Sequence, residues 1–341
     1  MNESNYISPT TNGSPLDPAT GLSGRRITRF SPPPFAHIPV MVESVTEIFS
    51  TVPSGLILDA TIGGGGHSLE ILKSREDLNV IGIDQDSEAL AAADSNLVGF
   101  ANRVSLIHGR FDDLSAVAKQ MGNQKLSGFL FDLGVSSYQL DNPHRGFSFR
   151  NDGPLDMRMN PDSQITAGEY VNGATEEELA SLLYNYGDEK YSKRVARAIV
   201  SMRPILGTKE LADIICDAIP ARSKRSPGHP ARRSFQALRI AVNCEIEILE
   251  SSIREAIRLL KIGGRGVVLS YHSGEDKVVK RTLRQLAGLD ISNSKYHPEV
   301  HQQKKISLLA RKAQRASSDE ISKNPRASSA LLRKFEKVSD L

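Results

Sequence analysis

LILDATIGGGGHS, residues 56–68, is the stretch of this chain that decides its fold. An apolar run ends in Asp59, four glycines follow, and His67 opens an expected helix. Glycine lets the backbone come close to a ligand, and the free N–H groups in the first turn of a helix point toward it. A buried strand that enters a helix through such a loop is typical of a cofactor-binding site.

A second apolar run, VIGID, ends in Asp84 one strand further along the chain. An acidic side chain at the end of the second strand of such a unit can hold the two hydroxyls of a ribose. Together the two segments predict a site for a cofactor that contains adenosine.

Two cofactors compete for this site. A nicotinamide dinucleotide favours G-x-G-x-x-G, but Ser68 stands where the third glycine belongs. S-adenosylmethionine carries an ammonium and a sulfonium and no pyrophosphate, so the carboxylate of Asp59 beside the loop suits it better. We therefore prefer the methyl donor. A glycine-rich turn without a ligand is the least favoured interpretation, because ordering four glycines costs much backbone entropy.

Composition fits a soluble globular protein, with 39% hydrophobic and 24% charged residues among 341. The two cysteines, Cys216 and Cys244, are far apart, which argues against a disulfide framework and a zinc site. No apolar run is long enough to span a bilayer. We expect a cytoplasmic protein with no metal and no membrane association, whose oligomeric state the sequence leaves open.

Positive charge is concentrated in two segments, although the net charge is only +3. Residues 188–233 and 291–341 each hold eleven Lys or Arg against five Asp or Glu. This pattern favours a polyanionic partner. Lys190, Arg194 and Arg197 would share one face of a helix, and a solvated helix face without a partner is the alternative.

Strands and helices alternate as far as Asp132, which predicts a parallel sheet covered by helices on both faces. Ligands of such sheets bind beyond the carboxyl ends of the strands. Asp59, Asp84 and Asp132 end three of these strands, and Phe111 follows another, so we expect these side chains at one edge. The expected strands are 56–59, 80–84, 103–107 and 128–133, and the expected helices are 40–50, 67–74, 87–96 and 112–121.

The alternation stops after Asp132. A turn-rich stretch precedes helices expected from 175 to 235, and apolar spacing predicts one long helix over about 234–260 that ends at Gly263–Gly264. A strand is expected at 266–271. The segments ISLLA (306–310) and LLRKFEK (331–337) predict a final antiparallel pair.

Several segments carry a family resemblance: HIPVMVESV, DATIGGGGHS, GIDQD, HGRF, GDEKYSKRVARAIV, RRSFQALRIAVNCEIEIL, SYHSGEDKVVK and NPRASSALLR. The longest and most specific is DLGVSSYQLDNPHRGFSFRNDGPLDMRM, residues 132–159. In these segments the chain resembles the bacterial RsmH (MraW) family of 16S rRNA (cytosine-N4)-methyltransferases. The resemblance runs from His37 to about Lys337.

The resemblance implies a class I S-adenosylmethionine-dependent methyltransferase fold, Rossmann-like with a mostly parallel sheet and an inserted helical domain. It implies methyl transfer to the exocyclic 4-amino group of a cytidine in the decoding region of 16S ribosomal RNA, within the small ribosomal subunit. The family's donor contacts fall on Gly65, Gly66, His67, Asp84, Phe111, Asp132 and Gln139.

The expected domains follow from these observations. Residues 1–36 hold six of the 17 prolines and are expected to form a disordered tail. Residues 37–140 and 235–341 would form the methyltransferase domain, and 141–234 a helical insertion that binds the RNA substrate.

Asp132 is the first choice for a catalytic acceptor near the reacting amine, and the alternative is that it binds only the donor. His272 could approach the target base, and the alternative is that it is a structural residue. The target base must leave its stack, and Phe147, Phe149 or Tyr138 could pack on it.

Two other function classes stay open. A non-catalytic RNA-binding factor of ribosome assembly would show the same basic segments, but the intact donor loop argues against it. A nicotinamide-dependent oxidoreductase is disfavoured by Ser68.

Overall fold

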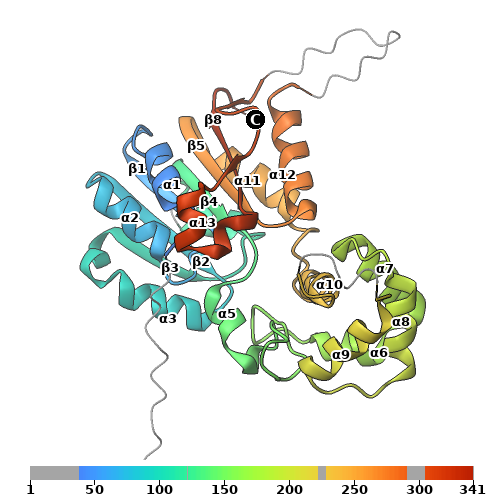
Figure 1. Cartoon of the computed structure of the whole chain (residues 1–341). Coiled ribbons are helices and arrows are strands. Elements are labelled where there is room, and N and C mark those ends of the chain that lie inside the picture. The colour runs from blue at the N-terminus through green and yellow to red at the C-terminus, as the bar shows by residue number, and fades with distance from the viewer. Residues whose placement is uncertain (1–37, 121, 222–227, 290–303, 341) are drawn as a thin grey trace, which may run out of the picture. The chain divides into compact units, whose positions relative to one another are not determined.

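The computed structural model describes residues 38–120, 122–221, 228–289 and 304–340, so the expected tail 1–36 lies outside the described residues. Its central sheet has the strand order β3-β2-β1-β4-β5-β8-β6, with β7 beside β8. Strands β1 to β5 run parallel, and β8 is antiparallel to both β5 and β6 (Figure 1). The strands are β1 Gly55–Asp59, β2 Leu78–Asp84, β3 Val104–His108, β4 Leu126–Asp132, β5 Leu260–Ser270, β6 Ile306–Leu308, β7 Gln314–Arg315 and β8 Leu331–Lys337.

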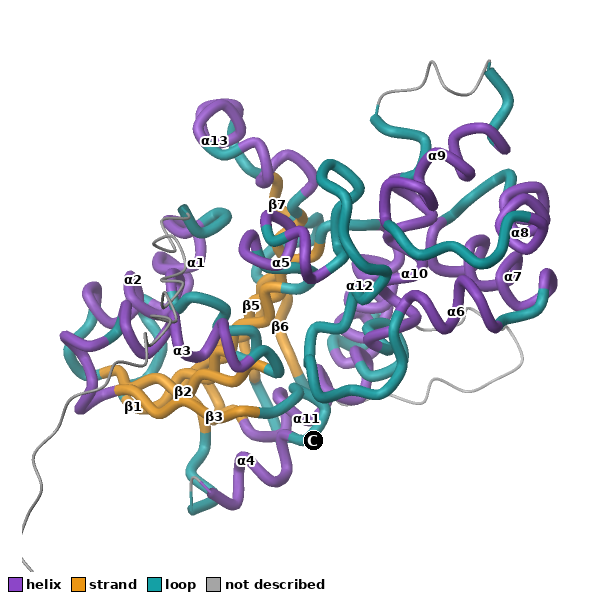
Figure 2. The backbone as a smooth tube through the Cα atoms, turned by 90° about the horizontal axis from the view of Figure 1, so that it is seen from below, coloured by secondary structure: helices purple, strands orange, loops and turns teal. Residues whose placement is uncertain are grey.

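Helices cover both faces of the sheet (Figure 2). Two apolar cores lie between these helices and the sheet, one on each face. Successive residues of a strand point to opposite faces, so Ile57 belongs to one core and Leu58 to the other. The first core lies under α1 Val42–Phe49, α2 Gly66–Ser74, α3 Ser87–Asn96 and α13 Ser318–Lys323. The second lies under α4 Leu114–Gln120, α11 Leu249–Leu259 and α12 Ser273–Leu286.

The strand order indicates where a ligand would bind. The chain runs outward through β1, β2 and β3, and then returns to the other side of β1 with β4. Such a reversal leaves a crevice beyond the carboxyl ends of the strands, where open parallel sheets bind their ligands. Asp59, Asp84 and Asp132 end β1, β2 and β4 at that edge, as predicted. The predicted fold class is therefore confirmed.

A group of helices lies between β4 and β5 in the chain. It has its own apolar core, to which Leu183, Val195, Ile199 and Leu238 contribute. Because α10 packs in this core, the helical group continues beyond residue 234, where the predicted insertion ends. The division into domains stays a prediction. The helices are α5 Ser137–Asp141, α6 Ala167–Gly173, α7 Glu176–Gly187, α8 Ser192–Ser201, α9 Thr208–Ala218 and α10 Arg232–Asn243.

The predicted long helix over about 234–260 is wrong. The chain forms two helices there, because Cys244 takes a left-handed conformation with φ 52° and ends α10. The N–H of Glu245 then bonds back to the carbonyl of Ile240, which closes the helix end. A cysteine is not a typical residue for this conformation, so the apolar spacing alone gave no sign of the break.

The predicted helix end at Gly263–Gly264 is also wrong. Both glycines lie inside β5, which begins at Leu260 rather than at 266. Between Leu260 and Arg265 the strand carries extra residues relative to β4, and Gly263 has φ 82° in this irregular stretch. The predicted antiparallel pair at the end of the chain is confirmed as β6 and β8.

No described helix has the length and apolar character that crossing a bilayer requires.

Gly266 makes room for two buried rings at the centre of the sheet. A Cβ there would lie 2.3 Å from Cζ of Phe335 and 2.8 Å from Cζ of Phe129, which pair with Gly266 from the flanking strands. Gly266→Ala is expected to lower the free energy of unfolding by about 1–3 kcal/mol, because an overpacked core must shift its neighbours. Denaturant unfolding measures the change. Gly99→Ala is the control, since a Cβ at Gly99 meets nothing within 4 Å, and an equal loss in both variants would contradict the packing argument.

Candidate active site

The glycine loop between β1 and α2 needs glycine at two of its predicted donor-binding positions. Gly65 lies directly before α2 and has φ 80°, a conformation that residues with a side chain rarely adopt. A Cβ at Gly66 would lie 2.6 Å from Cγ of Pro39. The packing around the loop therefore leaves no room for a side chain at Gly66, and the backbone conformation favours glycine at position 65.

Asp59, which ends β1, is bonded to the helix that follows this loop. Its carboxylate accepts a hydrogen bond of 2.7 Å from the hydroxyl of Ser68, and only 1% of the residue is exposed. Burial raises the pKa of the Asp59 carboxyl to about 6, although the bond from Ser68 opposes the rise. Ser68, which departs from the dinucleotide pattern, thus holds a buried carboxylate that is turned away from any open surface.

Asp84 connects the loop to the second strand. Its Oδ2 accepts the N–H of Gly63 at 2.9 Å, and its Oδ1 accepts the N–H of Asp86 at 2.9 Å. Burial raises the pKa of the Asp84 carboxyl to about 6. Two backbone donors fix the direction of this carboxylate, and each oxygen keeps further acceptor capacity for a ligand.

Asp132 is more accessible than Asp59, with 25% of its side chain exposed. The hydroxyl of Tyr271 donates to its Oδ1 at 2.6 Å, and Nδ1 of His67 lies 3.7 Å from its Oδ2, too far for a hydrogen bond. His67 is itself held by a contact of 2.9 Å between its Nε2 and the carbonyl oxygen of Val40. Burial raises the pKa of the Asp132 carboxyl, whereas the nearby His67 lowers it.

Like charge is concentrated at this edge of the sheet. Burial is the main cause of the raised pKa at Asp59 and at Asp84. Like charge nearby adds a smaller rise, from Asp132 at Asp59 and from Asp86 and Asp59 at Asp84. A cationic ligand would relieve this repulsion, and a polyphosphate would add to it. The residues present therefore fit S-adenosylmethionine and do not fit a dinucleotide.

Phe111 and Gln139 lie at the margin of this edge. The ring of Phe111 meets Phe131 edge-on at 5.3 Å between centroids. Gln139 is 4% exposed, donates to Oδ2 of Asp86 at 2.9 Å and accepts the N–H of Ser136 at 3.1 Å. Both ends of its side-chain amide are therefore already hydrogen-bonded within the chain. One of the partners, Asp86, is two residues after Asp84 in the sequence.

Residues 34–338 match the family model described as the MraW methylase family. The chain belongs to the MraW methylase family. A protein named ribosomal RNA small subunit methyltransferase H from Heliobacterium modesticaldum is 44% identical over 310 residues, covering 89% of this chain and 99% of the relative. The protein of the same name from Thermobifida fusca is 42% identical over 318 residues, covering 92% and 96%. An rRNA methylase structure from Streptococcus thermophilus matches 89% of this chain and 100% of its own at 12% identity and a TM-score of 0.41.

Membership of the MraW methylase family confirms the predicted class of enzyme, a methyltransferase that uses S-adenosylmethionine. The roles of the individual site residues stay predictions. Among the described residues, no group of three or more His, Cys, Asp or Glu is arranged to hold a metal ion.

Sequence reasoning missed three side chains of the site. Tyr271, which binds Asp132, follows directly after β5, and its place at a strand end was a usable signal. Asp86 and Arg145 form a buried pair with 2.7 Å between Oδ2 and a guanidinium nitrogen. Both stand in family segments, but nothing in the sequence links one to the other.

Two of the aromatic residues that we expected to pack on the target base have their rings in or against the core of the helical group. Phe147 is 6% exposed and belongs to the core of the helical group. Phe149 stacks on His229 with 4.3 Å between ring centroids and packs against the same core. His272 caps α12, where its Nδ1 accepts the N–H of Glu275, so the structural interpretation fits it better.

Replacing Asp84 by Ala is expected to weaken S-adenosylmethionine binding by about 1.5–3 kcal/mol, the scale of a hydrogen bond to a charged group. The ionised carboxylate is the form that accepts from both ribose hydroxyls. Since its pKa is about 6, donor affinity should be full above that pH and fall as the pH drops through it. Calorimetric titration from about pH 5 to about pH 8 measures both effects.

The matched control is Asp94→Asn, which removes an exposed carboxylate from α3. This variant should keep both the affinity and the pH profile. Unchanged affinity in Asp84→Ala, or an unaltered pH profile in Asp84→Asn, would remove Asp84 from the donor site.

Proposed function

We propose that this protein methylates the exocyclic 4-amino group of a cytidine in the decoding region of 16S ribosomal RNA, within the small ribosomal subunit. The observation that carries the proposal is the setting of Asp132 at the end of β4. Its side chain is 25% exposed, one oxygen is fixed by Tyr271, and the other lies beyond hydrogen-bond reach of His67. The relatives' name, ribosomal RNA small subunit methyltransferase H, supports the class of substrate.

Donor binding is assigned to the edge formed by the glycine loop and β2. Gly65 and Gly66 shape the loop, Asp84 would accept from the ribose hydroxyls, and Phe111 and Gln139 would border the site. S-adenosylmethionine, when bound, supplies a methyl group on a positively charged sulfur. The carboxylates at the strand ends favour that positive charge and orient the molecule that carries it.

Asp132 has the properties that the acceptor nucleotide requires. The amine of cytosine is a weak nucleophile because its lone pair is delocalised into the ring. An acceptor that binds an N–H of this amine holds it in place and can receive the proton that the nitrogen releases. The raised pKa of Asp132 brings its basicity closer to that need, and Tyr271 fixes the carboxylate by donating to its other oxygen.

We propose that residues 141–234, which make up most of the helical group, bind the RNA. On α8, Val195 and Ile199 are buried, while Arg194 and Arg197 are exposed on the other side, next to the exposed Lys190. Arg197 forms an ion pair of 3.2 Å with Glu176 and remains 76% exposed. We propose that this face binds phosphates and that the enzyme acts in the cytoplasm.

Mass spectrometry of 16S ribosomal RNA tests the function directly. Small subunits from cells without the protein should lack one methyl group on a cytidine amine, and the purified protein with S-adenosylmethionine should restore it. Asp132→Ala should lower kcat at saturating donor by about 100-fold or more, the scale of a lost general acid–base group.

Two outcomes contradict parts of this proposal. Full methylation without the protein removes the assigned substrate. A raised KM for the donor with kcat preserved would mean that Asp132 binds only the donor.

Changing Lys190, Arg194 and Arg197 together to Ala should weaken binding to the small subunit and reduce the dependence of affinity on salt, because fewer counterions are released. Filter binding at several salt concentrations measures the slope. Donor affinity should stay the same, because the donor site is built from strand ends. An unaltered slope would assign these residues to an ordinary solvated helix face.

A further inference from the structure

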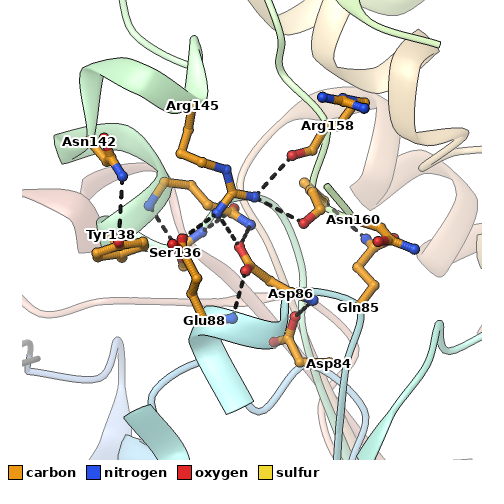
Figure 3. A network of polar contacts seen from close by, with 12 residues as sticks. Asp84, Gln85, Asp86, Glu88, Ser136, Tyr138, Asn142, Arg145, Arg158 and Asn160 are labelled. Carbon is orange, nitrogen blue, oxygen red and sulfur yellow. Dashed lines mark hydrogen bonds and ion pairs between the residues drawn. The ribbon is translucent and has the colours of Figure 1, made fainter. Parts of the chain in front are cut away.

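A partly buried ionic network joins the end of β2 to the segment 136–159 (Figure 3), and of the predicted donor contacts only Gln139 takes part in it directly. At its centre Asp86 is 1% exposed. Its Oδ1 accepts the N–H of Glu88 and so caps α3, and its Oδ2 accepts from both Gln139 and Arg145. Since the N–H of Asp86 is bonded to the carboxylate of Asp84, the network begins at the proposed ribose site.

Arg145 spans two parts of the chain with one guanidinium group. One terminal nitrogen donates to Asp86 at 2.7 Å and to Glu88 at 3.0 Å. The other donates to the carbonyl oxygens of Arg158 and Met159, each at 3.0 Å. Figure 3 shows Arg145 lying across the gap between these groups. Only a planar fork of several donors can satisfy both sides at once.

The far side of the network is fixed to the helical group. Asn243, in the last turn of α10, accepts the N–H of Met159 and donates to the carbonyl of Met157, both at 2.8 Å. Met157 itself has φ 60°, a strained conformation for a residue with a side chain, and its N–H bonds to the carbonyl of Arg145 at 3.0 Å. The turn 156–159 is thus held from the donor side by Arg145 and from the helical side by Asn243.

We propose that Arg145 is a positioning residue that couples donor binding to the conformation of the turn 156–159, and through it to RNA binding by the helical group. A donor that binds Asp84 restrains Asp86, and Asp86 restrains Arg145. Because coupling between two sites is reciprocal, RNA held by the helical group tightens donor binding by the same factor. The RNA part of this inference rests on the proposed function.

Hydrogen exchange without RNA tests the coupling inside the protein. Saturating S-adenosylhomocysteine, the product form of the donor, should slow exchange at the amides of Met157 and Met159 in the unaltered protein. In Arg145→Gln the donor should still bind, and the same amides should show no added protection. No change in the unaltered protein, or equal protection in the variant, would falsify the proposal.

Binding of small subunits that lack the methyl group gives the second measurement. Their affinity for the unaltered protein should rise about 5-fold or more when S-adenosylhomocysteine is present, the usual lower range of coupling between sites. Arg145→Gln should reduce this ratio to about 1. Arg150→Gln is the matched control, because it removes the same charge from an exposed position on the same segment and should leave the ratio unchanged.

Further variants separate positioning from simple structural support. Arg145→Lys keeps the charge but cannot contact both sides, so it should fold and still lose the coupling. If single variants fold poorly because Asp86 is left as an unpaired buried charge, the double variant Asp86→Asn with Arg145→Gln removes both charges and keeps a good helix cap. Coupling that survives in these variants contradicts the role of Arg145. Failure of the unaltered protein to bind any subunit, with the exchange effect present, contradicts only the proposed RNA substrate.

Discussion

Burial of three carboxylates at one edge of the sheet is the physical constraint that shapes the rest of the site. Asp59, Asp84 and Asp132 end the adjacent parallel strands β1, β2 and β4, so all three lie at one edge of the sheet. Partial removal from water raises the pKa of each, which shows that their ionised forms are under strain. A site of this kind favours a ligand that brings positive charge.

The chain relieves this strain differently at each position. At Asp59 it supplies the hydroxyl of Ser68 and closes the surface, so this carboxylate serves the loop. At Asp84 it supplies two backbone N–H groups, which fix the carboxylate without occupying all of its acceptor capacity. At Asp132 it supplies the hydroxyl of Tyr271 to Oδ1, and Nδ1 of His67 lies 3.7 Å from Oδ2. The three carboxylates therefore differ in how far their oxygens are already bonded within the chain, although the residues are of the same type.

The segment that follows β4 contributes polar side chains to this edge of the sheet. It returns Gln139 and Arg145 to the end of β2, and it anchors its own far end on α10 through Asn243. The strained turn at Met157 persists because it is bonded on both sides. Conformations of this kind are found where the surrounding structure determines them strongly, often next to functional groups.

Local sequence patterns were enough to predict the parallel sheet, the glycine loop, the strand-terminal carboxylates and the class of cofactor. These features depend on local periodicity and on the backbone needs of glycine, which a short window of residues records. The local patterns failed at Cys244 and at Gly263–Gly264, where the backbone conformation depends on packing rather than on residue type. The pairing of Tyr271 with Asp132, 139 residues away, and of Arg145 with Asp86, 59 residues away, became known from the folded structure. Such partners are set by how distant elements pack, because any of many polar side chains could satisfy a buried carboxylate until the fold brings one of them within reach.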